Sequence, residues 1–339
     1  MRTLPAVFAA ALSLSLAIAS GPARANDSSA ELTTGGLELR QNAVVEMDSE
    51  DLFVSAKEIR VRYRFVNPTQ QAVTTLVAFP MPDVTVSGPD ENISVPTEEP
   101  ENLLAFRTLV NGAPVAARVE QKALAKGVDR TALLRELGAP LAPHLRATGE
   151  ALDRLPPPAK DQLLKLGLAE IEEFDAGKGW EKHLSPRWTL KTTWFWEQTF
   201  APGETLIEHA YKPSVGGSAG TSFGAKDWRN DKSAAEAARR YCVDQDFLAS
   251  IERVRRAARA DYPPLSEERI SYVLSSGANW AKPIRDFRLV VDKGAPDRLI
   301  SLCAQGVRKI SPTQFEWRRR DFRPAGDLHV LILKKQGAE

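Results

Sequence analysis

The residue types that most often perform chemistry are few and widely spaced in this sequence. No two of the four histidines lie closer than 26 residues, so none can form a metal-binding pair within a turn or two of helix. The sequence has no Gly-x-Ser-x-Gly nucleophile elbow, no phosphate-binding loop and no dinucleotide fingerprint. We therefore predict no catalytic residue, no metal and no cofactor from local motifs. The histidines are His144, His183, His209 and His329.

Tryptophans offer the clearest candidate for ligand contact. Trp194 and Trp196 are two residues apart within 188–200, a spacing that places both side chains on one face of a strand. An open face would let the two rings stack on sugars. The same face also carries Leu190 and Phe200, which is the pattern of a sandwich core. Both interpretations follow from the sequence, and the core is favoured.

Asp83 is the first carboxylate to consider if the protein is an enzyme. It follows Phe79-Pro80-Met81-Pro82, where proline must end a strand. A hydrolase would need such a carboxylate to meet a second titratable group from a distant segment. The alternative role for Asp83 is to cap the turn through its side chain, as aspartate often does.

The sequence contains two cysteines, Cys242 and Cys303. In an oxidising compartment a single disulfide between them is the simplest expectation. The alternative is two buried free thiols, which behave as small apolar side chains.

The first 25 residues have the order of a secretory leader. Arg2 provides a positive start, an apolar run extends from Leu4 to Ala19, and Ala23-Arg24-Ala25 forms a small-x-small cleavage site. We expect cleavage after Ala25, which makes Asn26 the first mature residue. A membrane anchor is the alternative, but the run is shorter than the ~20 residues of a spanning helix. The sequence thus predicts a periplasmic or secreted protein with no transmembrane segment once the leader is removed.

Composition places the chain among globular proteins. It has 339 residues and a formal net charge of +1, with 43% hydrophobic and 26% charged residues, which excludes collagen, coiled coils, polytopic membrane proteins and disorder throughout. Residues 26–185 carry an acidic excess and residues 186–339 a basic one. The basic runs at 253–256 and 318–320 are interpreted as solvated faces, and no nucleic-acid partner is expected for an exported protein.

Alternation of apolar and polar residues predicts a mainly β fold. Along 59–65, apolar side chains alternate with Arg60, Arg62 and Arg64, so one face is buried and the other is wet. Asn111-Gly112 predicts a tight hairpin. We expect two antiparallel β-sandwich domains, at 26–120 and 186–339, separated by a helical spacer at 121–185. A basic helix at about 233–259 is expected as an insert in the second sandwich.

Several segments together resemble a known family. They are Asn26–Ala30, Glu50–Ser55, Val77–Asp83, Ser276–Trp280 and Phe287–Asp292. The combination is similar to the bacterial secreted family called domain of unknown function 4424, over nearly the whole mature chain. The resemblance implies export and a two-part β architecture, and it brings no catalytic residues. More loosely, residues 37–120 are similar to the sandwich of vault and inter-α-trypsin type domains, which does not fix a function.

Two classes of function follow from these observations. The favoured one is a non-enzymatic protein of the cell envelope that binds a partner protein, a glycan or a lipid at a sandwich edge or domain junction. The alternative is a hydrolase acting on an envelope substrate, with a site assembled from distant carboxylates. A concave pocket in which perturbed carboxylates meet would favour the hydrolase.

Overall fold

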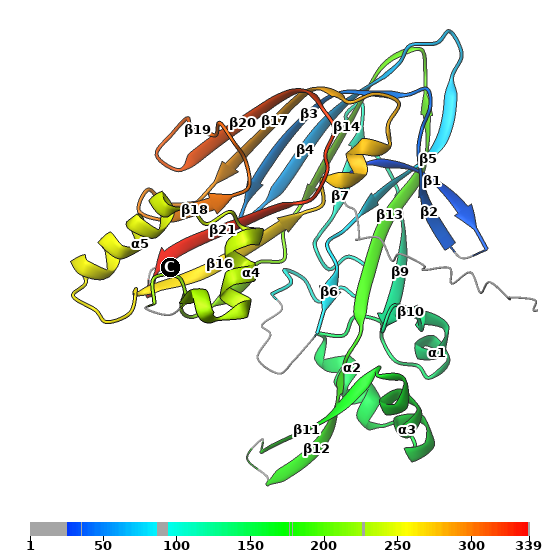
Figure 1. The fold of residues 1–339 in the computed structure, drawn as a ribbon. Helices are drawn as coiled ribbons and strands as arrows, with labels where there is room; N and C mark the ends of the chain where they lie inside the picture. Colours follow the sequence, from blue (N-terminus) through cyan, green and yellow to red (C-terminus); the bar gives the residue numbers. More distant parts are fainter. Residues whose placement is uncertain are drawn as a thin grey trace, which may run out of the picture.

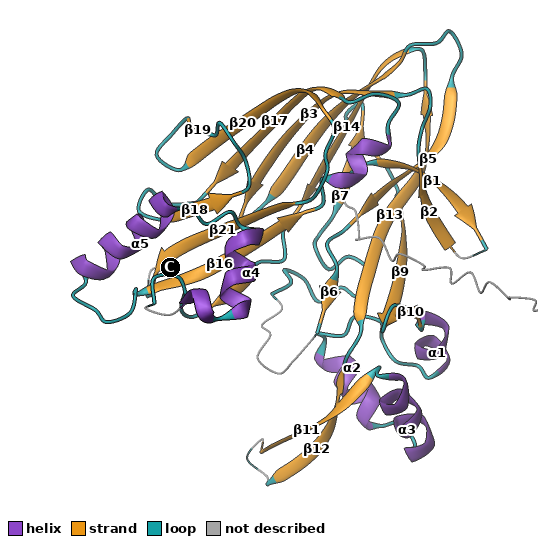
Figure 2. Ribbon diagram, in the orientation of Figure 1, coloured by secondary structure: helices purple, strands orange, loops and turns teal. Residues whose placement is uncertain are grey.

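The computed structural model describes residues 26–34, 36–86, 94–175, 177, 179–225 and 228–337. The expected leader, including Ala25, lies outside these ranges, and Asn26 is the first described residue. Within these ranges the chain is mainly β, as the sequence predicts, and helices lie at the periphery (Figures 1 and 2). None of the described helices is long and apolar enough to cross a membrane.

The largest sheet contains strands from both halves of the chain, lying side by side in Figure 1. We call it the large sheet, and in the described residues it has eight strands. Their order is β19 (Arg308–Lys309), β20 (Gln314–Phe322), β17 (Ile284–Asp292), β3 (Glu46–Ser55), β4 (Ile59–Asn67), β14 (Gly203–Tyr211), β7 (Arg107–Val110) and β8 (Ala113–Pro114). β17 runs parallel to β3, with Leu289 opposite Leu52, and the other neighbours are antiparallel.

Two further sheets pack against one face of the large sheet. The described part of the second sheet has the order β10 (Val128–Asp129), β9 (Arg118–Ala125), β13 (Thr189–Phe200), β5 (Val73–Pro80), β1 (Ser28–Thr33) and β2 (Gly36–Arg40), with β6 (Val84–Thr85) also paired to β13. The small sheet has the order β15 (Gly216–Ser218), β16 (Leu265–Tyr272), β21 (Leu328–Lys335) and β18 (Leu299–Leu302). A short 3₁₀ helix, η2 (Ser275–Asn279), follows β16.

Alternation along the strands determines which side chains reach the shared core. On β4, Ile59, Val61, Tyr63 and Phe65 are all buried, while the intervening arginines face solvent. On β13, Leu190, Trp196 and Phe200 of the expected stripe are buried as well, and Trp194 is partly buried. Phe195, on the opposite face of β13, is also buried. One apolar cluster joins residues of all three sheets, including Phe65, Phe200, Ile270 and Leu289. The predicted Asn111-Gly112 turn joins β7 to β8.

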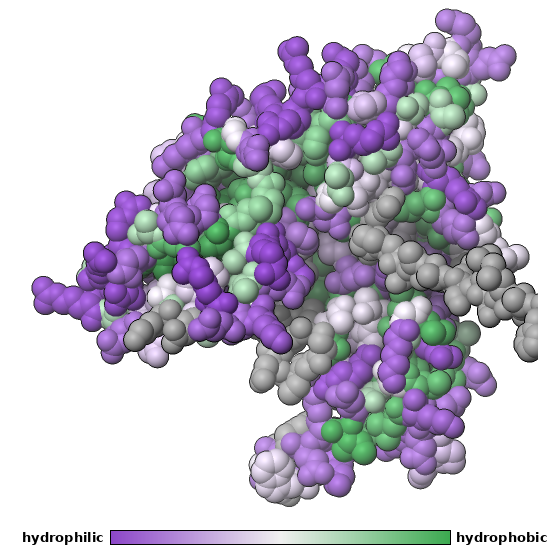
Figure 3. Space-filling model, in the orientation of Figure 1, coloured by the Kyte–Doolittle hydropathy of each residue, from purple (hydrophilic) through white to green (hydrophobic). Residues whose placement is uncertain are grey.

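The segment expected as a helical spacer forms a separate lobe with a small core of its own. It contains α1 (Thr131–Glu136), α2 (Arg146–Asp153), α3 (Pro157–Leu166) and the hairpin β11 (Ala169–Asp175)–β12 (Trp180–Pro186). Leu134, Leu152, Leu163 and Trp188 pack together inside it. Figure 3 shows apolar groups among polar ones at the surface around these helices.

Strands from the two expected sandwiches are interleaved. β13, from the C-terminal range, lies between β9 and β5 in the second sheet, and β17 lies beside β3 in the large sheet. The ranges 26–120 and 186–339 therefore share their sheets. Sequence alternation assigns the faces of a strand but says nothing about its distant neighbours.

The basic segment expected as one helix is two helices. They are α4 (Lys232–Arg240) and α5 (Gln245–Ala257), preceded by the 3₁₀ turn η1 (Trp228–Asn230). Cys242 adopts the left-handed conformation with φ 53°, which ends the helical path. Asp244 then starts α5 by accepting a hydrogen bond from the Phe247 amide.

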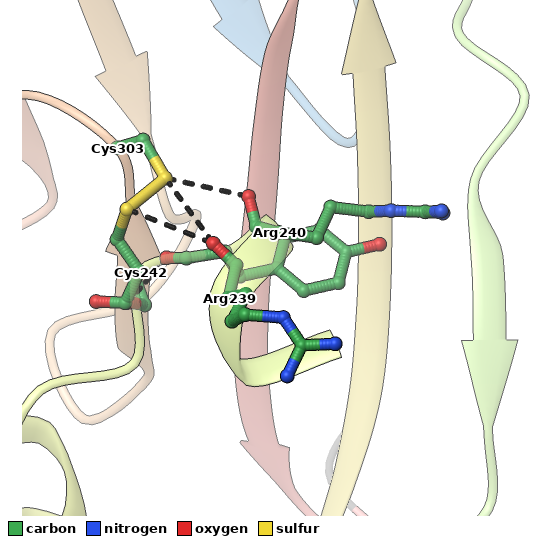
Figure 4. The surroundings of a disulfide bond; sticks show 6 residues. Arg239, Arg240, Cys242 and Cys303 are labelled. Carbon is green, nitrogen blue, oxygen red and sulfur yellow. Dashed lines mark hydrogen bonds between the residues drawn. A yellow bond between two sulfur atoms is a disulfide. The ribbon is translucent and has the colours of Figure 1, made fainter. Parts of the chain in front are cut away.

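The break between the helices is held to the small sheet by a disulfide. Cys242 and Cys303 are bonded, as the sequence predicts, with their Cα atoms 5.0 Å apart (Figure 4). Ser301 on β18 adds a hydrogen bond from its hydroxyl to the Tyr241 carbonyl, 2.9 Å away. Together they hold the α4–α5 junction against the end of β18.

Removing this disulfide should destabilise the protein. The bond closes a loop with a sequence separation of 61 residues. In the chain-entropy model such a cross-link is worth about 4 kcal/mol. We expect a Cys242→Ser/Cys303→Ser variant to lose that amount of unfolding free energy in urea titration, and reduced wild-type protein to behave the same way. An unchanged midpoint would contradict this role.

Candidate functional site

The outer face of the large sheet carries a hollow rich in arginine. Alternation on β4 that buries Val61 and Tyr63 sends Arg60 and Arg62 to the opposite side. The hollow has a volume of about 780 Å³. The charged groups in its lining are four arginines and two carboxylates, an excess of positive charge: Arg60, Arg62, Arg107, Arg288, Asp51 and Glu208. Phe53, Leu109 and Val290 provide apolar surface between them.

Strand register arranges these charges in a row of alternating sign. Arg288 on β17 is paired with Asp51 on β3, and Asp51 with Arg62 on β4. Arg62 is in turn paired with Glu208 on β14. Adjacent strands lie about 4.8 Å apart, so the backbone positions of Arg288 and Arg62, two strands apart, are separated by roughly 10 Å. The hollow therefore presents separate cationic points across several strands.

The next row along the strands is mostly apolar, with arginine interspersed. It places Val290 beside Phe53, Phe53 beside Arg60, and Ala210 beside Arg107. The Arg60 guanidinium lies 4.7 Å from the centre of the Phe53 ring, a cation–π contact. A ligand lying across both rows would contact cationic and apolar groups together.

Arg288 is the arginine of the hollow with the most ion-pair partners, Glu316 and Asp51. Its Nε lies 2.9 Å from Glu316 Oε1 and its Nη1 3.1 Å from Asp51 Oδ1. The Glu316 hydrogen bond is the largest contribution to a raised pKa for Arg288. Conversely, hydrogen bonds from Arg288 and Arg308 lower the pKa of Glu316 to about 2. These contacts fix one guanidinium in the hollow before any ligand arrives.

The other three arginines extend into solvent. The side chains of Arg60, Arg62 and Arg107 are 57%, 64% and 73% exposed. Their ion-pair distances to Glu58 or Glu208 are 3.2–3.7 Å, and such exposed pairs contribute little stability. These guanidinium groups can therefore turn to an incoming anion at small cost.

A second set of polar groups lies buried where the three sheets meet. Asp27 precedes β1, and its Oδ1 lies 3.0 Å from Nε2 of His209 on β14, with both side chains fully buried. The indole of Trp280 donates to the Asp27 carbonyl, 2.7 Å away. Burial raises the pKa of the Asp27 carboxyl, and His209 opposes the shift. We call this group, with the residues of the next paragraph, the buried polar centre.

Glu50 and two tyrosines complete the buried polar centre. Glu50 Oε2 accepts from the Asn26 side-chain amide, 3.1 Å away. The hydroxyl of Tyr63 on β4 lies 2.9 Å from that of Tyr272 on β16, and Tyr63 also donates to the Asn26 side-chain carbonyl. Burial raises the pKa of Glu50 to about 8. All these side chains are buried, so they have no open path to a substrate in this structure.

The candidate ligand residues from the sequence do not come together. Trp196 is 3% exposed and contacts the His209 ring edge-on, with centroids 5.6 Å apart. Trp194 is half-buried and stacks on Phe106. Asp83 Oδ2 lies 3.6 Å from Lys191 Nζ. Because side chains alternate along a strand, Lys191 lies on the opposite face of β13 from Trp194. Burial raises the pKa of Asp83.

The sequence predicted that the arginines of β4 are exposed, but it did not predict that they line a hollow. The alternating arginines of 59–65 indicated a solvent-exposed face of a strand. Their partners Asp51, Glu208 and Arg288 come from segments whose pairing is not encoded locally. Among the residues that the structure describes, no group of three or more His, Cys, Asp or Glu side chains could hold a metal ion.

The fold and the hollow define a class of β-rich protein with a shared central sheet and one open, charged face. The chain belongs to the family described as "Domain of unknown function (DUF4424)", whose model matches residues 25–331. No curated protein matches the chain. One similar solved structure is a "putative nutrient binding protein" from Legionella pneumophila. It has 16% identity and a TM-score of 0.43, over 92% of this chain and 72% of that one.

Glu316 should contribute to acid stability. Because its folded pKa is lowered from 4.5 to about 2, its stabilising effect is complete above pH ~4.5 and is lost as the pH falls towards 2. We expect a Glu316→Gln variant to be less stable than wild type at pH 7, with the difference shrinking between pH 4.5 and 2. Urea titrations across this range test it. A constant difference at all pH values would contradict the assignment.

Proposed function

We propose that the protein is a non-enzymatic binding protein that holds a small anionic ligand, bearing carboxylate or phosphate groups, in the arginine-rich hollow. The observation that carries this proposal is the excess of arginines over carboxylates in a concave surface of about 780 Å³. That volume is in the range of small-molecule sites. Arginine presents a planar fork of donors that matches carboxylate and phosphate oxygens.

The paired arginine and the exposed arginines would contact the ligand in different ways. Arg288, held by Glu316 and Asp51, provides a fixed contact. Arg62 and Arg107 are exposed and can adjust to the ligand. Asp51 and Glu208 would repel a ligand that presents negative charge everywhere, which favours anionic groups at defined spacing over a uniform polyanion.

We place the protein in the periplasm or outside the cell. The leader pattern that ends at Ala25 supports this, as does the disulfide between Cys242 and Cys303. The ligand would then be a solute or a component of the cell envelope.

Hydrolysis is less well supported by the geometry. Two carboxyl groups with raised pKa values, those of Glu50 and Asp27, lie with His209 in the buried polar centre. Raised pKa values arise there from burial between sheets, and the arginine-rich hollow lies on the opposite side of the large sheet. The structure thus favours a structural role for these groups.

The proposal predicts that a ligand co-purifies and depends on two exposed arginines. Native mass spectrometry of protein purified gently from its own cells should show a reproducible added mass. An Arg62→Gln/Arg107→Gln variant should lose it, because both cationic contacts are gone. Arg146→Gln on α2 is the matched control, since Arg146 is 93% exposed and remote from the hollow, and it should keep the ligand.

Calorimetry with defined probes provides a second test. Citrate and inorganic phosphate should bind wild-type protein and the Arg146→Gln control, and added salt should weaken binding. The double variant should bind at least about tenfold more weakly. Absence of both a co-purified mass and any probe binding would refute the proposal, as would equal binding by all three proteins.

A further inference from the structure

The first described residues of the chain are completely buried. Asn26 and Asp27 have no exposed surface, whereas the first residues of a chain cut after Ala25 would usually be exposed. The Asn26 backbone nitrogen donates to Ser276 Oγ, and the Ser276 hydroxyl donates to the Asn26 carbonyl, 2.6 Å away. A Cβ added at Gly277 would clash with the Asn26 side-chain nitrogen, so η2 fits closely around this residue.

The buried surroundings of Asn26 contain two carboxyl groups and one histidine. Glu50 and Asp27 are both fully buried carboxyl groups, and His209 is the titratable partner of Asp27. Within the described part of the chain, no lysine or arginine forms an ion pair with either carboxyl. Buried carboxylates are normally paired with a cation or kept neutral. Without a cation the two carboxyl groups stay neutral, which agrees with their raised pKa values, and a positive group placed beside them would let them ionise.

Hydrogen-bond acceptors are in excess there. Asp27 Oδ2 and Glu50 Oε1 are buried and have no hydrogen-bond partner among the described residues. An amide nitrogen at Asn26 has one hydrogen to donate, and Ser276 accepts it. A free α-ammonium group at the same position has three. The two additional donors would belong to the residue whose side chain already donates to Glu50.

We propose that the mature chain begins at Asn26 and that its α-ammonium group is buried as the counter-charge of Glu50 and Asp27. Cleavage between Ala25 and Asn26 would then do more than release the leader. It would create the charge that completes the contact between the three sheets, so that the exact position of the cut determines stability. This inference is independent of the ligand proposed for the arginine-rich hollow.

The test compares two chains that differ by one residue. One begins at Asn26 with a free amine, and the other carries a single glycine before Asn26, so that Asn26 retains an amide; both lack residues 1–25. We expect the glycine chain to melt roughly 5–10 °C lower at pH 7, because a buried charge has lost its partner. Equal melting temperatures would overturn the proposal.

Glu50→Gln in both chains separates charge pairing from simple crowding by the glycine. In the chain that begins at Asn26, the substitution removes the partner of the ammonium group and should lower the melting temperature. In the glycine chain it removes an uncompensated carboxyl and should leave the melting temperature unchanged or raise it. The same effect of Glu50→Gln in both chains would show that the glycine acts only by its bulk, and would refute the pairing.

Chemical protection of the amine tests the burial directly. An amine-specific aldehyde reagent at pH 7 should label the chain that begins at Asn26 at least about 100-fold more slowly when folded than in urea, because the amine opens to solvent only when the structure does. Peptide mapping identifies the labelled group. The terminal glycine of the second chain lies beyond Asn26 and should be labelled readily. Fast labelling of Asn26 in the folded state, or an exported protein whose first residue is not Asn26, would overturn the proposal.

Discussion

The contact between Asp27 and His209 joins two parts of the fold that nothing in the local sequence connects. Asp27 lies at the start of the second sheet and His209 lies on the large sheet, 182 residues later. Tyr272 brings the small sheet to the same place through the hydroxyl of Tyr63. Each sheet packs its apolar side chains over the others, but apolar packing alone tolerates sliding. Directional hydrogen bonds between buried groups fix the position of the three sheets relative to one another.

The two faces of the large sheet have different surroundings. Its inner face, with Tyr63, His209 and Leu289, is covered by the other two sheets. Its outer face leaves Arg60, Arg62 and Arg107 in solvent. Because successive residues of a strand point to opposite sides, a residue of the inner core lies next in sequence to a residue of the hollow. The strands that carry the buried polar centre therefore also set the positions of the arginines.

Local features of the fold were predictable, and pairings over long distances were not. Alternation assigned the two faces of β4 and most of the buried stripe of β13, in which Trp194 is only partly buried, and Asn111-Gly112 predicted the hairpin, because each depends on neighbouring residues. The parallel pairing of β17 with β3 is set by packing between segments more than 200 residues apart, so the expected division into two sandwiches missed the interleaved strands. The break at Cys242 was hidden because the segment on both sides has helical residue types.

Three of the five segments that suggested the family from sequence meet in the folded chain. Asn26–Ala30, Glu50–Ser55 and Ser276–Trp280 each contribute to the buried polar centre, through Asn26, Glu50 and Ser276. The candidate site was less accessible to prediction. The sequence indicated that Arg62 is exposed. That it lines a hollow depends on Asp51, Glu208 and Arg288, which lie on three other strands.

Hydrogen exchange on a mature chain that lacks residues 26 and 27 tests most directly whether the buried polar centre holds the sheets in place. Removing Asn26 and Asp27 leaves Glu50 and His209 without their partners. The account predicts a joint loss of amide protection in β1, in η2 and at the Tyr272 end of β16, while α1–α3 keep theirs. Unchanged protection across all these elements would contradict the claim that this contact positions the three sheets.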